Sequence, residues 1–486
     1  MFGLDHAQQE AIGLRFVLNQ LTPNSPFGAE QMKQIRPFTR GEQGAVLACF
    51  DNIEKVISLS EENKAGLDEL CLHLMSLKQI RGTIHKCENH TLHQVELFEV
   101  KNFLLIFEKL ELVFQRLHGC VQFVDIDLEP LREALDTLDP DSKRIAAFVI
   151  DSPELAGIRR EKLHVEALLQ KEKTQSAESV FTTKRFELVK REAEEEARVM
   201  QALTEKLRPY RAAFLANLDN IGKLDLTIAK AMLALTYGGI RPKLSTRGSV
   251  SLQNMSNPFV TEALRKNNQT LTKVSLTLPE GVTIITGANM GGKSVSVKTA
   301  VLNVVLCQLG FFVFADAAEI PLFDGVCLIS EDMQDIGRGL SSFGAEITRF
   351  NEVVSRLKEE FLFLALDEFA RGTNPEEGTS IVRAVASYLS ESGSVCVMTT
   401  HYDRVVLPAF KHYQVAGLNF PKTEGESKRS LSSIAAYMDY NLIEAGVHTA
   451  PPRDALNICK LIGLDKDVLK RIGDEYMDAG GEASGT

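Results

Sequence analysis

Hydrophobic residues recur every three to four positions through most of the first 240 residues, which predicts a mainly helical N-terminal half. The clearest periodic runs are 42–59, 67–79, 92–117, 128–138, 155–173 and 214–235. Residues 180–183 are briefly β-like, and the chain becomes dense in charge from Lys184 onward. That dense stretch favours a solvated helix face or an antiparallel coiled arm, with a dedicated partner-binding arm as the alternative.

After residue 240 the pattern changes to short β-type segments and continuous apolar runs. Residues 250–252 and 274–278 are β-type and alternate with polar loops. Three further runs are mainly apolar: 282–285, 361–366 and 395–400. The run at 361–366 is apolar throughout, as expected of a parallel strand buried on both faces. Because helix-compatible segments such as 295–309 separate them, we expect an α/β domain with a parallel sheet.

A glycine-rich loop joins the strand at 282–285 to the helix at 295–309. It reads Gly287, Ala288, Asn289, Met290, Gly291, Gly292, Lys293 and Ser294. A strand, such a loop, Lys-Ser and a helix in this order are typical of the phosphate-binding loop of nucleotide hydrolases. Glycines let backbone N–H groups turn toward phosphates, Lys293 neutralises phosphate charge, and Ser294 offers a hydroxyl to Mg²⁺. The alternative is a glycine-rich turn without a ligand, which would not need a strand before it or Lys-Ser and a helix after it.

Polar residues follow the other two apolar runs. Asp367 and Glu368 come directly after the run at 361–366, where parallel sheets bind ligands. Asp367 can hold Mg²⁺, and Glu368 can deprotonate the attacking water. His401 follows the third run, and either contact with the γ-phosphate or a buried structural role fits it equally well.

Ser341 and Ser342 begin a further predicted helix, between the phosphate loop and the run at 361–366. A helix that starts with two serines can bind an anion, and because the chain already has a phosphate loop, this second site could serve a neighbouring subunit. An ordinary serine N-cap is the alternative.

Composition limits the class of protein. A chain of 486 residues is expected to form two or three domains, and 44% hydrophobic with 24% charged residues is ordinary for globular proteins. The net charge of −11 argues against a freestanding nucleic-acid binder but leaves room for a local basic groove. We expect a cytoplasmic protein without membrane spans, because the sequence contains no long apolar span and no signal peptide, and its eight cysteines are scattered.

One cluster allows two interpretations. His85, Cys87, His90 and His93 lie close together in the sequence. They could share a metal ion, or they could mark a polar helix entry with surface histidines, which is the default expectation.

Four motifs together resemble the MutS family of ABC-type ATPases: residues 286–294, 340–343, 366–378 and 399–402. Weaker similarity covers most of the remaining chain, including 25–28, 151–160, 224–231 and 454–469. The resemblance implies an α/β P-loop (ABC-type) ATPase domain preceded by a mostly α-helical core and lever domain. The ranges that it implies are a helical core (1–150), lever helices with a truncated clamp (151–240), the ATPase domain (241–450) and a C-terminal helical dimerisation segment with a tail (451–486).

The same resemblance implies an ATPase that converts ATP to ADP and phosphate with Mg²⁺. In it, Gly287–Ser294 bind the nucleotide, Ser294 and Asp367 bind Mg²⁺, Glu368 is the catalytic base and His401 the sensor. Ser341 and Ser342 approach ATP bound to the other subunit of a homodimer, or of a heterodimer with another MutS-like subunit. Hydrolysis then moves the helical levers.

Departures from the family pattern leave the target open. This sequence shows no mismatch-reading domain, no aromatic-x-Glu wedge and no nuclease-type module, and the acidic junction after residue 190 replaces most of the clamp. The family favours ATP-dependent binding of double-stranded or branched DNA in mismatch repair or recombination. The shortened clamp and the acidic charge favour a remodeller of a partner enzyme, such as a reactivation factor for a cobalamin-dependent aminomutase. An ATP-gated structural dimer is a third reading.

Overall fold

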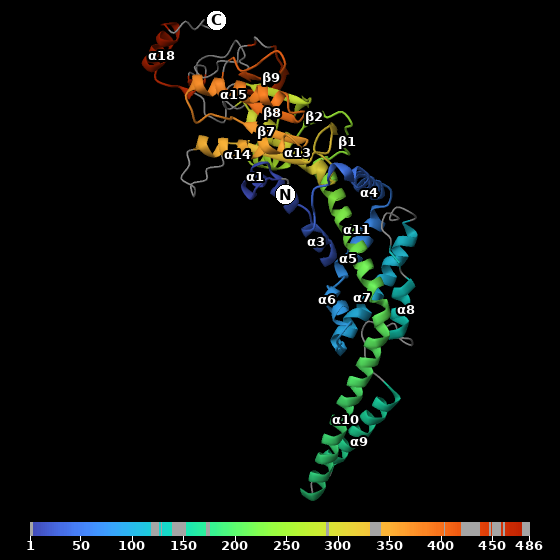
Figure 1. The fold of residues 1–486 in the computed structure, drawn as a ribbon. Helices are drawn as coiled ribbons and strands as arrows, with labels where there is room; N and C mark the ends of the chain where they lie inside the picture. The colour runs from blue at the N-terminus through green and yellow to red at the C-terminus, as the bar shows by residue number, and fades with distance from the viewer. Residues whose placement is uncertain are drawn as a thin grey trace. The chain divides into compact units, whose positions relative to one another are not determined.

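The computed structural model describes residues 3–117, 126–127, 129–138, 152–171, 175–287, 291–330, 342–402, 404–418, 438–446, 449, 458–459 and 462–478. The chain divides into two compact units (Figure 1). The sheet unit comprises 1–21, 36–51 and 232–486, and the helical unit comprises 22–35 and 52–231. The sequence predicted a different division, into 1–150, 151–240, 241–450 and 451–486, which follows expected function and stays a prediction.

The helical unit contains most of the helices predicted for the N-terminal half. Its elements are α3 (Pro26–Lys33), α5 (Lys64–Ser76), α6 (Arg81–Lys86), α7 (Gln94–Arg116), α8 (Glu129–Leu138), α9 (Pro153–Lys171), α10 (Gln175–Leu207) and the 3₁₀ turn η2 (Arg208–Tyr210). Helices α4 (Gln43–Glu62) and α11 (Arg211–Tyr237) have residues in both units. Aromatic rings of Phe27, Phe103, Phe107 and Phe214 pack on one another in the core of this unit.

A fully buried carboxylate joins α11 to the start of α3. Asp225 accepts hydrogen bonds from the backbone N–H and side-chain amide of Asn24, at 2.9 and 3.0 Å, and from the N–H and hydroxyl of Ser25, at 2.6 and 2.7 Å. A Cβ atom on Gly28 would lie only 2.2 Å from Asp225 Oδ2. The contact therefore requires both the acid and a glycine one turn into the helix.

Helices α9 and α10 form an antiparallel pair. Arg159 pairs with Glu192 at 3.1 Å and with Glu196 at 2.8 Å, whereas Arg185, further from Glu192 toward the start of α10, pairs with Glu166 at 2.8 Å. Residues later in α9 thus pair with residues earlier in α10, so the two helices run antiparallel. Between the helices lies a small apolar cluster of Ile158, Val165 and Leu188, with Leu169 and Phe181 against it. The structure thus contains the antiparallel arm that the sequence favoured.

The β-like expectation for residues 180–183 is wrong, because this segment lies inside α10. Phe181 stands seven residues, or two helical turns, before Leu188, and both side chains join the cluster between the helices. The hydroxyls of Thr182 and Thr183 donate to the carbonyls of Glu178 and Ser179, four residues back, at 2.7 and 2.9 Å. Packing on α9 therefore outweighs the strand propensity of these side chains.

The sheet unit contains two sheets with helices around them. Its helices are α1 (His6–Ala11), α2 (Leu14–Asn19), η1 (Arg40–Glu42), α12 (Pro258–Arg265), α13 (Lys293–Gln308), α14 (Ser342–Arg356), α15 (Pro375–Ser390) and α18 (Lys466–Asp478). The smaller sheet has the order β1 (Lys243–Leu244), β5 (Ala317–Ile320), β2 (Val250–Met255), β3 (Val274–Leu278).

The larger sheet contains the three apolar runs as adjacent parallel strands. Its order is β10 (Met438–Glu444), β9 (Lys411–Leu418), β4 (Gly281–Thr286), β8 (Val395–Thr399), β7 (Leu362–Asp367), β6 (Gly325–Ser330). All neighbours run parallel except β10, which is antiparallel to β9. Strands β4, β7 and β8 therefore end at one edge of the sheet, where each is followed by one of the predicted polar motifs.

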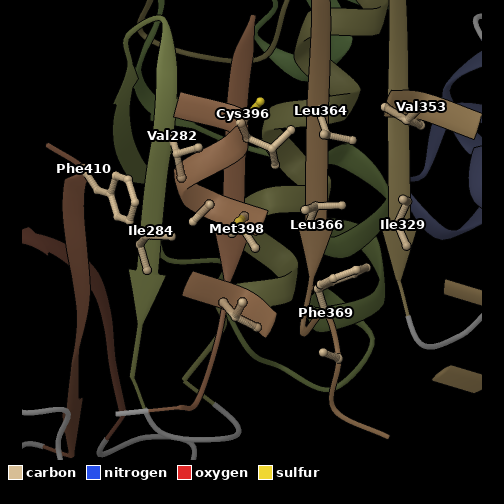
Figure 2. Packing of buried hydrophobic residues seen from close by; sticks show 14 of the residues in the cluster. Val282, Ile284, Ile329, Val353, Leu364, Leu366, Phe369, Cys396, Met398 and Phe410 are labelled. Atoms are coloured by element: carbon tan, nitrogen blue, oxygen red, sulfur yellow. The ribbon is translucent and has the colours of Figure 1, made fainter. Parts of the chain in front are cut away.

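One face of this sheet is covered by α14 and α15. Figure 2 shows alternate residues of neighbouring strands, such as Ile284, Leu364 and Met398, pointing into a common apolar layer. Val353 of α14 and Val382 of α15 belong to the same layer. Helix α13 contacts β6, β7 and β8, and it also contacts β2 of the smaller sheet. This packing explains why the three runs lack the polar alternation of half-exposed strands.

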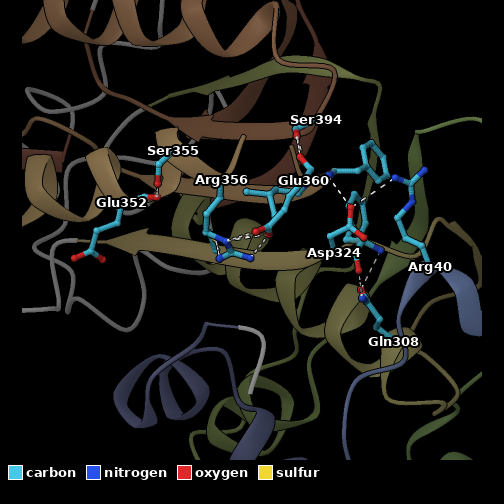
Figure 3. A network of polar contacts seen from close by, with 12 residues as sticks. Arg40, Gln308, Asp324, Glu352, Ser355, Arg356, Glu360 and Ser394 are labelled. Atoms are coloured by element: carbon cyan, nitrogen blue, oxygen red, sulfur yellow. Dashed lines mark hydrogen bonds and ion pairs between the residues drawn. The ribbon is translucent and has the colours of Figure 1, made fainter. Parts of the chain in front are cut away.

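A polar network fixes the amino end of β7, opposite the end that bears Asp367 (Figure 3). Asp324 accepts the N–H of Phe361 at 2.8 Å, and Ser394 accepts the N–H of Leu362 at 3.1 Å. Arg356 donates to both carboxylate oxygens of Glu360. These contacts hold the backbone at the start of β7 in place.

No helix in the part of the chain that the structure describes is both long and apolar enough to cross a membrane.

Replacement of Asp225 by Asn tests the buried contact of the helical unit. An amide would present N–H donors to groups that are themselves donors, so we expect the free energy of unfolding to fall by about 3 kcal/mol. The matched control is Asp219→Asn on the same helix, where a half-exposed carboxylate pairs with Arg81 and contributes less than about 1 kcal/mol. Urea titration of both variants measures the difference, and equal losses would contradict the role given to Asp225.

Candidate nucleotide site

The phosphate loop begins where β4 ends and leads directly into α13. Gly287 has φ of 141° and Gly292 has φ of 81°, values in the region that favours glycine. Cβ atoms at these positions would lie 2.9 Å from Val415 Cβ and 3.0 Å from Tyr440 Cδ1. Both the backbone and its neighbours therefore require these glycines. Ala288, Asn289 and Met290 lie outside the described residues.

Lys293 is the first residue of α13 and is buried, with 3% of its surface exposed. Its Nζ donates to the carbonyl of Gly287 at 2.8 Å and lies 3.7 Å from Glu368 Oε1. Burial lowers the pKa of the Lys293 ammonium, whereas the nearby carboxylates of Glu368 and Asp367 raise it. The ammonium thus lies between the carbonyl of Gly287 and the carboxylate of Glu368, beside the pocket, where it can meet phosphate oxygens.

Asp367 is the last residue of β7, and two hydroxyls donate to the same oxygen of its carboxylate. Ser294 Oγ lies 2.9 Å and Thr399 Oγ1 lies 2.7 Å from Asp367 Oδ1. Burial raises the pKa of the Asp367 carboxyl, and the two hydrogen bonds oppose that rise. Carboxylate and hydroxyl oxygens 2.9 Å apart are ligands of the kind Mg²⁺ prefers, so this pair fits the ion that the sequence implied.

Glu368 follows in a left-handed backbone conformation, with φ of 53°. Its N–H donates to Thr399 Oγ1 at 2.8 Å, and its Oε2 accepts from Arg371 at 2.8 Å. Ala370, with φ of 63°, donates its N–H to Glu346 at 2.9 Å. Two non-glycine residues in this conformation cost about 1–2 kcal/mol each, so the surrounding hydrogen bonds hold the turn against strain.

His401 and Tyr402 follow β8 at the same edge of the sheet. Their rings lie 4.4 Å apart between centroids. The Tyr402 hydroxyl donates to the carbonyl of Ala370 at 2.8 Å, and a Cβ atom on Gly378 would lie 2.3 Å from that hydroxyl. The histidine segment is thus attached to the turn that carries Glu368.

A pocket of about 830 Å³ opens beside these residues. Gly292, Lys293, Ser294 and Glu368 line one part of it. The rest is lined by α12 and the segment after it, including Leu264 and 267–272, and by Met438 and Tyr440 of β10. Its volume lies in the range of ligand sites, and charged groups at one side with apolar groups at the other fit a nucleotide.

Sequence reasoning missed three contributors to this site. Thr399 belonged to a recognised motif, but nothing in the sequence showed that its hydroxyl would meet Asp367. Tyr440 and residues 267–272 carry no motif and reach the pocket only through the fold. Ser341 lies outside the described residues, and Ser342 begins α14. The serines of the second anion site therefore stay a prediction.

The histidine and cysteine cluster of the helical unit has other partners. Cys87 is buried, and its Sγ lies 3.6 Å from the carbonyl of Thr204. His93 is the N-cap of α7. Across the described ranges, no three His, Cys, Asp or Glu side chains are grouped so as to hold a metal ion.

These features define a class: an α/β domain with a phosphate-loop motif and a pocket at the carboxyl edge of a mainly parallel sheet. Residues 283–472 match the family model of MutS domain V. The match includes Lys293, Asp367, Glu368 and His401, so this part of the chain is similar to MutS domain V.

The chain is also similar to proteins named Endonuclease MutS2. The protein from Caldicellulosiruptor saccharolyticus is 32% identical over 288 residues, which are 58% of this chain and 34% of that protein. The protein from Streptococcus equi subsp. zooepidemicus is 25% identical over 478 residues, 91% of this chain and 58% of that protein. The chain thus spans from about a third to somewhat over half the length of these relatives.

His412 connects the strand before the phosphate loop to the segment after β10. It is buried, with Nδ1 3.0 Å from the carbonyl of Gly446 and Nε2 2.8 Å from the hydroxyl of Thr286. A carbonyl only accepts, so Nδ1 carries the proton and Nε2 accepts from Thr286. Burial lowers the pKa of His412, which keeps the imidazole neutral.

This lowered pKa predicts a pH dependence of stability. His412 has a pKa near 6.5 in the unfolded state and a lower pKa in the folded state, so the unfolded state binds a proton first as the pH drops. The free energy of unfolding therefore falls from about pH 7 toward the folded pKa. We expect thermal melting between about pH 7 and pH 5 to fall more steeply for the wild type than for His412→Gln. Replacement of the exposed His90 by Gln is the control and should leave the slope unchanged. Parallel slopes for wild type and His412→Gln would refute this account.

Proposed function

We propose that the sheet unit binds ATP with Mg²⁺ and hydrolyses it to ADP and phosphate. The observation that carries this proposal is that Lys293 and Ser294, at the start of α13, and Glu368, directly after β7, line one pocket, with Asp367 hydrogen-bonded to Ser294 beside it. The MutS domain V match over 283–472 supports it.

Each residue has a distinct role in this proposal. Lys293 neutralises phosphate oxygens, and Ser294 and Asp367 hold Mg²⁺, which supplies charge stabilisation at the transferring phosphoryl group. Glu368 accepts a proton from the attacking water, and Arg371 and Lys293 hold its carboxylate in place. His401 would act as the sensor of the γ-phosphate.

A second subunit would complete the proposed site. Ser341 and Ser342 would approach ATP bound to the partner subunit of a homodimer or a MutS-like heterodimer, so that two sites are completed together. The nucleotide state would then bias the position of helices α9, α10 and α11, which act as levers.

DNA, double-stranded or branched, is the first candidate for what the levers grip. The relatives that match this chain carry the name Endonuclease MutS2, which fits mismatch repair or recombination. Exposed Arg160 on α9 and Arg191 on α10 are positioned on the arm to contact phosphates in this reading.

A protein partner is the second candidate, and the ion pairs of the arm favour it. Arg159, Lys162, Lys184 and Arg185 each pair with a glutamate across α9 and α10, which reduces the positive charge available to a phosphate backbone. In this reading the levers open a partner enzyme, as a reactivation factor for a cobalamin-dependent aminomutase would.

Glu368→Gln tests the hydrolytic step. The amide keeps the shape of the side chain but cannot accept the proton of water, so we expect kcat to fall by about 10²–10⁴-fold while ATP still binds and accumulates on the protein. Turnover of labelled ATP and retention of nucleotide after gel filtration measure the two effects. Glu376→Gln, an exposed acid at the start of α15, is the control. Unchanged turnover in Glu368→Gln would remove this residue from the role of base.

DNA dependence of ATP turnover separates the two candidate targets. If DNA is the target, duplex or branched DNA stimulates turnover at about 50 mM salt, and stimulation weakens steeply by about 200 mM. Arg160→Glu with Arg191→Glu should then weaken DNA binding while turnover without DNA stays unchanged. Absence of binding to either DNA at the lower salt concentration would favour the protein partner.

A further inference from the structure

We propose that Thr399 is a positioning residue of the hydrolytic site, which holds the metal-binding carboxylate and the backbone of the catalytic base with one hydroxyl. This inference rests on the proposed ATP hydrolysis and assigns a role to a residue that acts through Asp367 and Glu368. Thr399 is the last residue of β8 and is buried, with 1% of its surface exposed.

The sheet register brings Thr399 beside the two acids. Strands β7 and β8 are parallel neighbours in which Leu366 is opposite Met398, so the next residues on both strands also lie side by side. Thr399 Oγ1 donates to Asp367 Oδ1 at 2.7 Å and accepts the N–H of Glu368 at 2.8 Å. Because the hydroxyl has one proton, the bond to Asp367 fixes its direction and leaves a lone pair for Glu368.

The bond to Glu368 matters because that residue is in a strained conformation. With φ of 53°, its backbone is in a region that L residues rarely adopt. Loss of the acceptor for its N–H would leave this turn with fewer restraints, and the Glu368 carboxylate would no longer be held between Lys293 and Arg371. A general base displaced by a fraction of an ångström loses efficiency.

The bond to Asp367 complements that of Ser294. Both hydroxyls donate to the same carboxylate oxygen, but Ser294 is also a proposed ligand of Mg²⁺. Thr399 holds the carboxylate from within the sheet, independently of the phosphate loop. Its removal is therefore expected to weaken the apparent affinity for Mg²⁺ and to lower turnover.

The hydroxyls of neighbouring buried threonines do not make the contacts that Thr399 makes. Thr400 accepts the N–H of Tyr402 at 3.0 Å and so shapes the histidine segment instead. Thr283, fully buried on the adjacent strand β4, has a hydroxyl without a hydrogen-bond partner among the residues that the structure describes. Thr283 therefore provides a matched control for the loss of a buried hydroxyl.

The test compares Thr399→Val, Thr399→Ser and Thr283→Val in the full chain. Valine keeps the shape of threonine and removes the hydroxyl, whereas serine keeps the hydroxyl. We expect Thr399→Val to lower kcat by about 10–100-fold, the effect of one lost hydrogen bond to a charged group. The Mg²⁺ concentration for half-maximal turnover should rise, while affinity for a fluorescent ATP analogue measured without Mg²⁺ stays within about twofold of wild type.

Thr399→Ser should recover most of the turnover, and Thr283→Val should match the wild type, with melting temperatures recorded for all variants. Equal losses in Thr399→Val and Thr399→Ser, or in Thr399→Val and Thr283→Val, would overturn the positioning role while leaving ATP hydrolysis intact. If Thr399→Val fails to fold, the serine variant alone decides, since unrecovered turnover in a folded Thr399→Ser protein contradicts the role. A wild type that hydrolyses no ATP would instead refute the proposed function, and this inference with it.

Discussion

Two adjacent carboxylates at the end of a buried strand set the main constraint on the sheet unit. A carboxylate removed from water costs several kcal/mol unless hydrogen bonds or opposite charges replace its hydration. Asp367 obtains these from the hydroxyls of Ser294 and Thr399, and Glu368 from Lys293 and Arg371. The partners come from the helix after β4, the end of β8 and the turn after β7. The order of the strands therefore also determines which groups stabilise the two acids.

The two ends of β7 have opposite characters. At the amino end, Asp324, Ser394 and the Arg356–Glu360 pair satisfy backbone and side-chain groups in ordinary conformations. At the carboxyl end, Glu368 and Ala370 adopt left-handed conformations that only their surroundings maintain. A rigid strand that ends in a strained turn is expected where a reaction depends on accurately placed side chains.

Much of the fold could be predicted because it depends on local patterns. Continuous apolar runs predicted β4, β7 and β8, and the spacing of the glycine loop predicted its position between a strand and a helix. The prediction failed at 180–183, where local propensity favoured a strand and the partner helix decided otherwise. The two acids at the site were predictable because they come directly after the apolar run at 361–366. Thr399, Tyr440 and His412 were not, since their partners are distant in the sequence.

The sequence by itself determined the kinds of elements, their order and the residue types that a phosphate-binding loop and a metal-binding strand end require. These properties depend on neighbours a few positions apart, which a periodic pattern or a short motif records. The tertiary structure alone decided that one threonine hydroxyl meets both acids, that Tyr440 lies against Gly292, and that Asp225 holds the start of α3. Those contacts depend on strand register and helix packing, which join residues tens to hundreds of positions apart.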